Sequence, residues 1–337
     1  MHVIWQATAR GCYRSKAVQF AFVFPGQGSQ YVGMGKALSD MSAEAVDVFE
    51  RADRAPGEPI SGLAFEGPAD ELDQTINAQP AMLATSIAYL RALTATADLP
   101  GPMFFAGHSM GQYSAMVAAG VLSLEDGIRL VHERGLQMQA SAADGSMAAV
   151  IGLPDDRLGE LETAGRALGV FTIANRNSPG QVVISGDRVA IEGAAEKAKE
   201  LGAKRAVMLP VSVAAHSPLM SRAADGMRRV LETVEFRDPS APLLANADAR
   251  PLTTAEGCRA ELVEHLTRGV DWIAAVEAMS AAGVRLFVEV GPGRVLTGLI
   301  RRIAPDAEAF ALDDQSAPGR LAIPDFLVTQ AGAGAAT

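Results

Sequence analysis

Short apolar runs that end in glycine-rich turns recur along the chain. Residues 19–24 (QFAFVF) lead into PGQGSQ, residues 103–106 (MFFA) lead into GHSMG, and residues 284–290 (VRLFVEV) lead into GPG. Residues 241–248 (APLLANAD) form another largely apolar run. Runs of this kind are typical of strands that are covered on both faces, as in a parallel sheet. The pattern therefore predicts several buried strands, most of which end in a turn.

Between these strands, apolar residues recur at the spacing of amphipathic helices. The spacing predicts helices over residues 34–54, 78–93 and 124–143. Ser123 is a suitable N-cap for the third of them, with Asp126 three residues later. Helices that alternate with buried strands act as crossover connections, so we expect an α/β fold with a mostly parallel sheet.

The pattern changes between residues 144 and 209. The segments 147–153 (MAAVIGL), 170–177 (VFTIANRN) and 181–186 (QVVISG) have the character of strands, and residues 187–202 read as a helix rich in Ala, Lys and Glu. Strands and a helix in this order predict a small α+β unit inserted into the larger fold.

The chain is long for one compact core, because single hydrophobic cores stop growing at roughly 250 to 300 residues. In these 337 residues we expect a large catalytic domain, formed by 19–143 and 210–318, and a small subdomain at 144–209. Residues 1–18 are expected to be an N-terminal arm outside the core. The tail 325–337 consists of small residues with few core-forming groups, and we expect it to be disordered.

Composition is that of an ordinary soluble protein, with 49% hydrophobic and 20% charged residues. No apolar run approaches the roughly 18 residues of a membrane span, and no signal peptide is recognisable at the N-terminus. We therefore expect a cytoplasmic protein that does not engage a membrane. Cys12 and Cys258 are too few for a disulfide framework and lack metal-ligand spacing. We expect two reduced thiols and no metal site.

The net charge of −10 argues against nucleic acid as a partner, because phosphates require a basic surface. An acidic partner would need a local basic patch, for which Arg294, Arg301 and Arg302 are candidates. Solvated charges on the outer face of a helix are the simpler interpretation of these arginines, and we favour it.

The segment GHSMG at 107–111 is the first candidate for chemistry. In a G-x-S-x-G turn between a strand and a helix, the glycines remove Cβ atoms that would block the turn, so the serine side chain projects outward. Ser109 would then be a nucleophile, and the N–H of Met110 would face the reacting oxygen. The pattern also recurs by chance, so a plain turn with a buried serine stays open as an alternative.

A serine nucleophile needs a base, and the chain contains five histidines. His108 lies inside the turn, so we expect its ring to point away from the serine, and His132 faces a different side of its helix from Arg134. His216, in VSVAAHSPLM, follows a strand-like run and is the best candidate. Imidazole has a pKa of about 6.5 and can both take and return a proton. A structural histidine is the alternative.

Six segments occur in order along the chain: FPGQGSQ (24–30), GHSMGQYSAM (107–116), ERG (133–135), ANRNSPGQVVISG (174–186), AHSPLM (215–220) and EVGPGRVLTG (289–298). Together they resemble the malonyl-CoA:acyl carrier protein transacylases, freestanding acyltransferases that also occur as acyltransferase domains of polyketide synthases. The resemblance runs from about Phe20 to Ile303. It implies a hydrolase-like large domain and a ferredoxin-like small domain, with a gorge between them that excludes water.

The resemblance also implies roles for individual residues. Ser109 matches the nucleophile and His216 its base, and the residue whose main-chain carbonyl orients that base matches His265. Gln27, in the PGQGSQ loop, matches the residue whose backbone N–H joins that of Met110 in an oxyanion hole. Such a pair of donors stabilises the charge that develops on the thioester oxygen.

Arg134 matches the arginine that binds the free carboxylate of malonyl. A guanidinium offers two parallel donors to a carboxylate and stays charged in a buried site, which suits this task. Without the resemblance, a surface charge on a helix would be the ordinary interpretation. Gln79, Asn175 and Asn177 match polar residues that face the gorge and contact substrate.

Two positions depart from the family pattern. The family usually has glutamate after GHSxG, where this chain has Gln112, a change that keeps the hydrogen-bonding shape near the acyl pocket and removes one charge. Relatives often have serine or phenylalanine before the histidine, where this chain has Ala215. The smaller side chain leaves room beside the α-carbon of the acyl group.

The expected function is ping-pong transfer of malonyl from malonyl-CoA to the phosphopantetheine thiol of acyl carrier protein, through an ester on Ser109. No bound metal or redox cofactor is needed, and a monomer is the expected state. A branched-malonyl donor for a polyketide carrier protein is one alternative, and the residues leave fatty acid and polyketide synthesis equally open. A serine hydrolase that clears acyl groups from carrier proteins is a second, and a catalytically silent docking subunit is the third.

Overall fold

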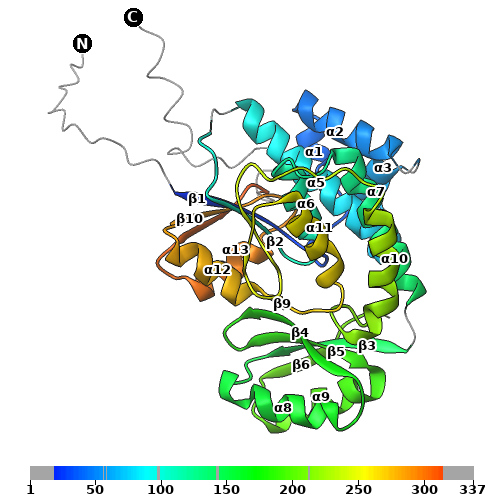
Figure 1. The fold of residues 1–337 in the computed structure, drawn as a ribbon, viewed down its shortest axis with the longest axis vertical. Coiled ribbons are helices and arrows are strands. Elements are labelled where there is room, and N and C mark those ends of the chain that lie inside the picture. The colour runs from blue at the N-terminus through cyan, green and yellow to red at the C-terminus, as the bar shows by residue number, and fades with distance from the viewer. Residues whose placement is uncertain are drawn as a thin grey trace, which may run out of the picture.

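The computed structural model describes residues 19–313, except residues 56, 58, 97, 98, 142, 143 and 212. The predictions for the arm at 1–18, for Cys12 and for the tail at 325–337 lie outside the described residues. Within them, the chain forms an α/β structure with two sheets (Figure 1). Cys258 is a buried free thiol. None of the helices in this part of the chain has the length and apolar character needed to cross a bilayer.

The larger sheet has six strands in the order β11-β10-β1-β2-β7-β8. Neighbouring strands are parallel except for the pair β7 and β8, so the mostly parallel sheet expected from the apolar runs is confirmed. Its strands are β1 (Phe20–Phe24), β2 (Phe104–Gly107), β7 (Leu243–Leu244), β8 (Pro251–Leu252), β10 (Leu286–Glu289) and β11 (Glu308–Ala311).

Strand β1 explains why this sheet needs helices on both faces. Phe20, Phe22 and Phe24 belong to a core shared with α1 to α7, α10 and α11, whereas Ala21 and Val23 belong to a core shared with α12 and α13. Figure 1 shows α12 and α13 on one side of the sheet and the larger group of helices on the other. Every residue of β1 is therefore buried, as the continuous apolar run predicts.

The helices differ from the predicted ranges at two places. The predicted helix 34–54 is two helices, because Ser42 is extended and accepts a hydrogen bond from the N–H of Ala45, which starts a new helix. The predicted helix 78–93 is longer and contains Pro80, whereas the third prediction is met by α7, capped by Ser123.

The helices around the large sheet are α1 (Lys36–Ser39), α2 (Ala43–Arg54), α3 (Ile60–Glu66), α4 (Ala69–Leu72), α5 (Thr75–Thr96), α6 (Gly111–Ala118), α7 (Leu124–Ala140), α10 (Ser221–Leu231), α11 (Ala255–Glu264), α12 (Trp272–Ala281) and α13 (Val295–Ile303), with a 3₁₀ turn η2 at Pro218–Met220.

The second sheet is formed mainly by the middle of the chain, in the order β6-β3-β5-β4-β9. All of its pairs are antiparallel except β4 with β9. Along the chain, its core reads strand, helix, strand, strand, helix, strand. The elements are β3 (Gly145–Ile151), η1 (Asp155–Arg157), α8 (Leu158–Arg166), β4 (Phe171–Ser178), β5 (Gln181–Asp187), α9 (Arg188–Glu200), β6 (Arg205–Met208) and, from further along the chain, β9 (Val270–Asp271).

The two faces of the second sheet pack in different directions. Val150 and Ile184 pack against α8 and α9, which lie on the outer side of this sheet in Figure 1. Met147 and Val183 belong instead to the core of the larger sheet. The two sheets therefore share a buried contact, and β9 adds a segment that lies outside the predicted small unit.

The three arginines considered for a basic patch lie on or beside α13, and all are exposed. Arg301 donates to the carbonyl of Ala309, and Arg302 donates to Oε1 of Gln181. Two of the three side chains thus tie α13 to neighbouring elements.

Candidate active site

The GHSMG segment forms a sharp turn between β2 and α6. Ser109 has a φ of 52°, a left-handed conformation that a residue with a side chain adopts at an energetic cost. A Cβ atom on Gly107 would overlap the backbone of Gly111, and one on Gly111 would overlap the carbonyl of Phe24. Gly107 is therefore required where the turn closes on the start of α6, and Gly111 where the turn packs against the end of β1.

His216 makes a hydrogen bond with the serine. Nε2 of His216 lies 2.8 Å from Oγ of Ser109, and Nδ1 lies 2.6 Å from the carbonyl oxygen of His265 and 3.0 Å from that of Arg268. Because carbonyl oxygens can only accept, the proton of a neutral ring belongs on Nδ1. Nε2 is then left as the acceptor for the serine hydroxyl.

The surroundings of His216 keep its ring uncharged. The side chain is 3% exposed, and burial followed by the positive charge of Arg134 lowers the pKa of His216 to about 4. At neutral pH the ring is therefore a free base.

The other described histidines face elsewhere. Nε2 of His108 lies 2.8 Å from Oδ1 of Asn177, and its ring meets Trp272 edge to face. The side-chain nitrogens of His265 are buried without a hydrogen bond in the described part of the chain, and its ring packs beside Tyr113 and His216. His265 thus contributes its carbonyl oxygen to the site, while its ring fills space.

Arg134 brings a positive charge to the serine. Nη2 of Arg134 donates to Oγ of Ser109 at 3.2 Å, and Nη1 donates to Oε1 of Gln79 at 2.8 Å. The side chain is 2% exposed, and Nε is buried without a hydrogen-bond partner in the part of the chain that the structure describes. Among the residues that the structure describes, no carboxylate lies within ion-pair distance of this guanidinium. Burial lowers its pKa, but an arginine stays charged at neutral pH.

The predicted oxyanion donors are the backbone N–H groups of Met110 and Gln27. Within residues 19–313 as described, neither the N–H of Met110 nor that of Gln27 donates a hydrogen bond. A Cβ on Gly26 would lie 2.5 Å from the carbonyl oxygen of His108, so the loop after β1 lies directly against the turn. The side chain of Gln27 is exposed and donates to Oγ1 of Thr75 at 3.3 Å.

The remaining predicted residues divide into two groups. Gln79 contacts Arg134, Asn177 contacts His108, and Ala215 directly precedes the base, so these lie around the serine. Asn175 lies on β4, and its Oδ1 is buried without a partner among the described residues.

The side chain of Gln112, which was expected to contact substrate, contacts backbone groups of the protein in the structure. Its Oε1 accepts a hydrogen bond from the N–H of Gly107, and its Nε2 donates to the carbonyl of Leu244. Both polar groups of this fully buried side chain are therefore used by the backbone of two neighbouring strands. Gln112 braces β2 against β7.

Asn246 and the carbonyl of Arg268 are site groups that the sequence reasoning missed. Asn246 accepts a hydrogen bond from the N–H of Ser109 at 2.9 Å. The available signal was the single asparagine in the apolar run APLLANAD, a polar residue at the end of a buried strand. Nothing in the sequence distinguishes the carbonyl of Arg268 from any other.

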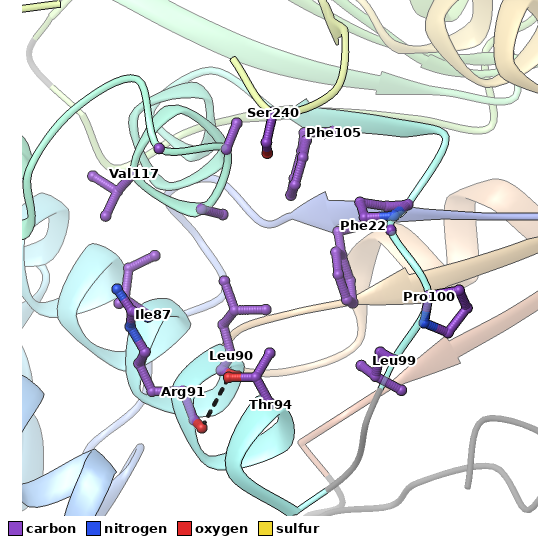
Figure 2. Close-up of a pocket in the computed structure, with 15 residues that line it drawn as sticks. Phe22, Ile87, Leu90, Arg91, Thr94, Leu99, Pro100, Phe105, Val117 and Ser240 are labelled. Atoms are coloured by element: carbon purple, nitrogen blue, oxygen red, sulfur yellow. Dashed lines mark hydrogen bonds between the residues drawn. The ribbon is translucent and has the colours of Figure 1, made fainter. Parts of the chain in front are cut away.

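A separate pocket lies away from this site. It has a volume of about 420 Å³ and is lined by apolar side chains that include Phe22, Leu90, Phe105 and Val117 (Figure 2). None of the predicted site residues lines it.

Comparisons with known proteins match this arrangement. The family model of the acyl transferase domain matches residues 21–311. The malonyl CoA-acyl carrier protein transacylase of Escherichia coli (strain K12) is 44% identical over 304 residues, which are 89% of this chain and 97% of that protein. The structure of an acyl-carrier-protein-S-malonyltransferase from Bartonella henselae is 45% identical with a TM-score of 0.86, over 89% of this chain and 96% of that one. A malonyl-transacylase solved in complex with its type II PKS acyl-carrier protein is 40% identical with a TM-score of 0.84, over 88% of this chain and 97% of that one. These matches confirm the resemblance carried by the six segments, and the chain belongs to the acyl transferase domain family.

Proposed function

We propose that this protein transfers a malonyl group from malonyl-CoA to the phosphopantetheine thiol of acyl carrier protein. The observation that carries the proposal is the buried guanidinium of Arg134, which lies 3.2 Å from the hydroxyl of Ser109 and has no carboxylate partner among the described residues. A buried charge is costly unless a partner compensates it. The carboxylate of a malonyl group is a partner of the right charge, and the relatives are named for this substrate.

The first half of the reaction loads the serine. His216 accepts the proton of Ser109 through Nε2 while Oγ attacks the thioester carbonyl, and the N–H groups of Gln27 and Met110 stabilise the resulting oxyanion. Collapse of this intermediate breaks the carbon–sulfur bond. His216 returns the proton to the departing thiolate of coenzyme A, which leaves a malonyl ester on Ser109.

The second half transfers the group to the carrier. The phosphopantetheine thiol gives its proton to Nε2 of His216 and attacks the ester carbonyl. When the ester bond breaks, the proton passes to Oγ of Ser109 and the free enzyme is restored. Protons and electrons balance with these groups alone, so the proposed steps need no redox cofactor.

The carbonyls of His265 and Arg268 hold the base through both halves. Each accepts from Nδ1–H, which keeps Nε2 directed at the serine. Since only backbone atoms are involved, the proposed role does not depend on the imidazole of His265. Gln79 plays a similar part for Arg134, because its Oε1 accepts from Nη1 and fixes the plane of the guanidinium.

We also propose the finer division of the fold. Residues 19–143 and 210–318 would form a hydrolase-like catalytic domain, and residues 144–209 a ferredoxin-like subdomain. The element order of the small sheet and its strand order β6-β3-β5-β4 support the second assignment. The hydrogen bond between His108 and Asn177 joins the serine turn to β4, which supports a substrate gorge between the two units, with Asn175 and Ala215 in its wall.

Acyl carrier protein is the proposed partner. A structural relative was solved in complex with such a protein, and the second half-reaction requires a thiol acceptor. The same relative is a polyketide enzyme by its description, whereas other relatives are named only as transacylases. We therefore propose a carrier protein that has a phosphopantetheine thiol, and we do not assign it to fatty acid or polyketide synthesis.

Radiolabelled malonyl-CoA tests the proposal directly. The wild-type protein should retain label on Ser109 after removal of free CoA ester, and the Ser109→Ala variant should retain none. Addition of phosphopantetheinylated carrier protein should then move the label onto the carrier. Absence of a labelled serine in the wild-type protein would refute the proposal, and competition with methylmalonyl-CoA decides between malonyl and branched donors.

A further inference from the structure

The side chain of Asn246 binds the backbone on both sides of the serine turn. Its Oδ1 accepts from the N–H of Ser109 at 2.9 Å, and its Nδ2 donates to the carbonyl of Gly107 at 2.8 Å. Asn246 is 4% exposed and follows β7 directly after Ala245. The carboxamide thus pairs with two backbone groups that flank His108, as a neighbouring strand would.

This pairing occurs where the sheet itself has ended. Strand β2 stops at Gly107 and β7 stops at Leu244, so the N–H of Ser109 has no strand partner. Ser109 also has a left-handed φ of 52°, which is unfavourable for a residue with a side chain and persists only where the surroundings enforce it. Asn246 is the side chain that binds the N–H of Ser109 itself, and together with Gln112, which accepts from the N–H of Gly107, it holds the backbone of the turn in this conformation.

The backbone of Asn246 connects to the segment that holds the base. Its N–H donates to Oε1 of Glu261 at 2.7 Å, and its carbonyl accepts from the N–H of Asp271 at 2.7 Å. Glu261 lies one helical turn before His265, and the N–H of His265 bonds the carbonyl of Glu261. Asp271 follows Arg268 by three residues. Asn246 therefore touches both ends of the stretch whose carbonyls bind His216.

We propose that Asn246 is a positioning residue that sets the distance between Ser109 and His216. Its side chain fixes the backbone of the nucleophile, and its main chain fixes the segment that orients the base. This inference rests on the proposed function, in which these two residues are the reacting pair. Loss of the carboxamide leaves the fold standing and lets the 2.8 Å contact between Oγ and Nε2 lengthen.

The test compares Asn246→Ala and Asn246→Asp with wild type. Single-turnover formation of the malonyl ester is expected to fall about 100-fold in Asn246→Ala, the usual cost of a misplacement near 1 Å, with KM for malonyl-CoA changed less than about twofold. Asn246→Asp keeps the acceptor for the N–H of Ser109 but places an oxygen opposite the carbonyl of Gly107. Its rate should lie between those of Asn246→Ala and wild type.

Asp53→Ala is the matched control for stability. Asp53 makes a comparable double contact with the N–H and hydroxyl of Ser61, at 2.8 and 2.6 Å, between α2 and α3. The Asp53→Ala substitution should lower the melting temperature of the protein and leave the rate of ester formation unchanged. A purely structural role for Asn246 would give the same result as Asp53→Ala, and that outcome overturns the proposal.

A second readout separates this inference from the proposed function. A small neutral phosphonofluoridate reacts with an activated serine and does not need Arg134. Its rate of reaction with Ser109 should fall in the Asn246 variants by the same factor as ester formation, even if malonyl-CoA is not the donor. Should Asn246→Ala fail to fold, an unchanged phosphonofluoridate rate in Asn246→Asp overturns the proposal.

Discussion

Arg134 donates a hydrogen bond to the very oxygen that His216 also contacts, the Oγ of Ser109. The guanidinium comes from the middle of α7 and the serine from the turn after β2, so the fold brings them together from separate elements. A cation at this position repels a proton on the imidazole and attracts an anionic acyl group. In the proposed function, selectivity for a charged substrate and the neutral state of the base would thus depend on the same side chain.

Replacement of Arg134 by alanine should separate charged from uncharged acyl groups. We expect kcat/KM for malonyl transfer to fall about 100-fold or more, because charge-assisted hydrogen bonds contribute about 1.5–3 kcal/mol each. Acetyl transfer should fall far less or rise. The control is Arg129→Ala, which removes an exposed arginine of the same helix that pairs with Asp126. Equal losses for malonyl and acetyl groups would argue against a carboxylate site.

Arg134 should also control the pH dependence of the serine. In the wild-type protein the pKa of His216 is lowered to about 4, so the rate of modification of Ser109 by a neutral phosphonofluoridate should be flat from pH 8 to pH 5 and fall only near pH 4. Burial is the largest cause of the low pKa and the charge of Arg134 is the second, so loss of the cation removes part of the shift. In Arg134→Gln the pH at which the modification rate falls should therefore rise, toward the ordinary histidine pKa of about 6.5. A wild-type limb already near that value would contradict the assignment of a buried neutral base.

Gln112→Glu tests the brace between β2 and β7. A carboxylate can accept from the N–H of Gly107 but cannot donate to the carbonyl of Leu244, so two acceptors would face each other in a buried site. We expect the introduced acid to have a raised pKa and the variant to lose about 1–3 kcal/mol of unfolding free energy at pH 8. At a pH below this raised pKa the introduced acid is protonated in the folded state and is better tolerated there. The loss of unfolding free energy should therefore be smaller at pH 5 than at pH 8.

Urea unfolding at both pH values measures this effect. Gln139→Glu, at an exposed position of α7, is the control and should unfold like wild type. If the difference in unfolding free energy between Gln112→Glu and wild type is the same at pH 5 and pH 8, the hydrogen bond to Leu244 does not have the importance assigned to it.

Glu261 should make the protein less stable as pH rises. Burial raises the pKa of Glu261 to about 7 from an ordinary value of about 4.5. The associated stability is present in full below about pH 4.5 and is lost as pH rises through about 7, on the order of 3 kcal/mol. Glu289 is buried with a pKa of about 7 as well and acts in the same direction.

The check is the free energy of unfolding between pH 4.5 and pH 8. Glu261→Gln keeps an acceptor for the N–H of Asn246, so it should fold and show a weaker decline with pH than wild type. Glu256→Gln, at an exposed position of the same helix, should keep the wild-type slope. Identical slopes in all three proteins would show that Glu261 is not buried as an acid.

The sequence was sufficient to predict β1, β2, β7 and β10 in the larger sheet and β3, β4 and β5 in the smaller one, but not β6, β8, β9 or β11. It also singled out Ser109 and His216, which a hydrogen bond joins in the structure. Strand β1 is apolar at every position, and two cores on its opposite faces explain this. Ser109 is bracketed by glycines that only a crowded turn requires. His216 and Arg134 were assigned with the help of the family resemblance, because a single histidine or arginine has no local pattern that separates function from structure.

Other features depend on contacts that no local pattern encodes. The break between α1 and α2 arises from one extended residue, Ser42, inside an otherwise continuous apolar period. The direction in which the Gln112 side chain points depends on how α6 is rotated against β2. Its position in the sequence is therefore compatible with a contact to substrate or with hydrogen bonds between β2 and β7. Asn246 has its role only because β7 ends beside the serine turn, which is a relation between segments 137 residues apart.

The edge strand β9 has a mechanical consequence. It pairs with β4 at Asn175 and Arg176, while Arg268, two residues before it, holds the imidazole through its carbonyl. A hinge motion that swung the smaller sheet outward would pull on this linkage and tilt the ring away from the hydroxyl. We therefore expect the smaller sheet to keep its position against the base during the reaction.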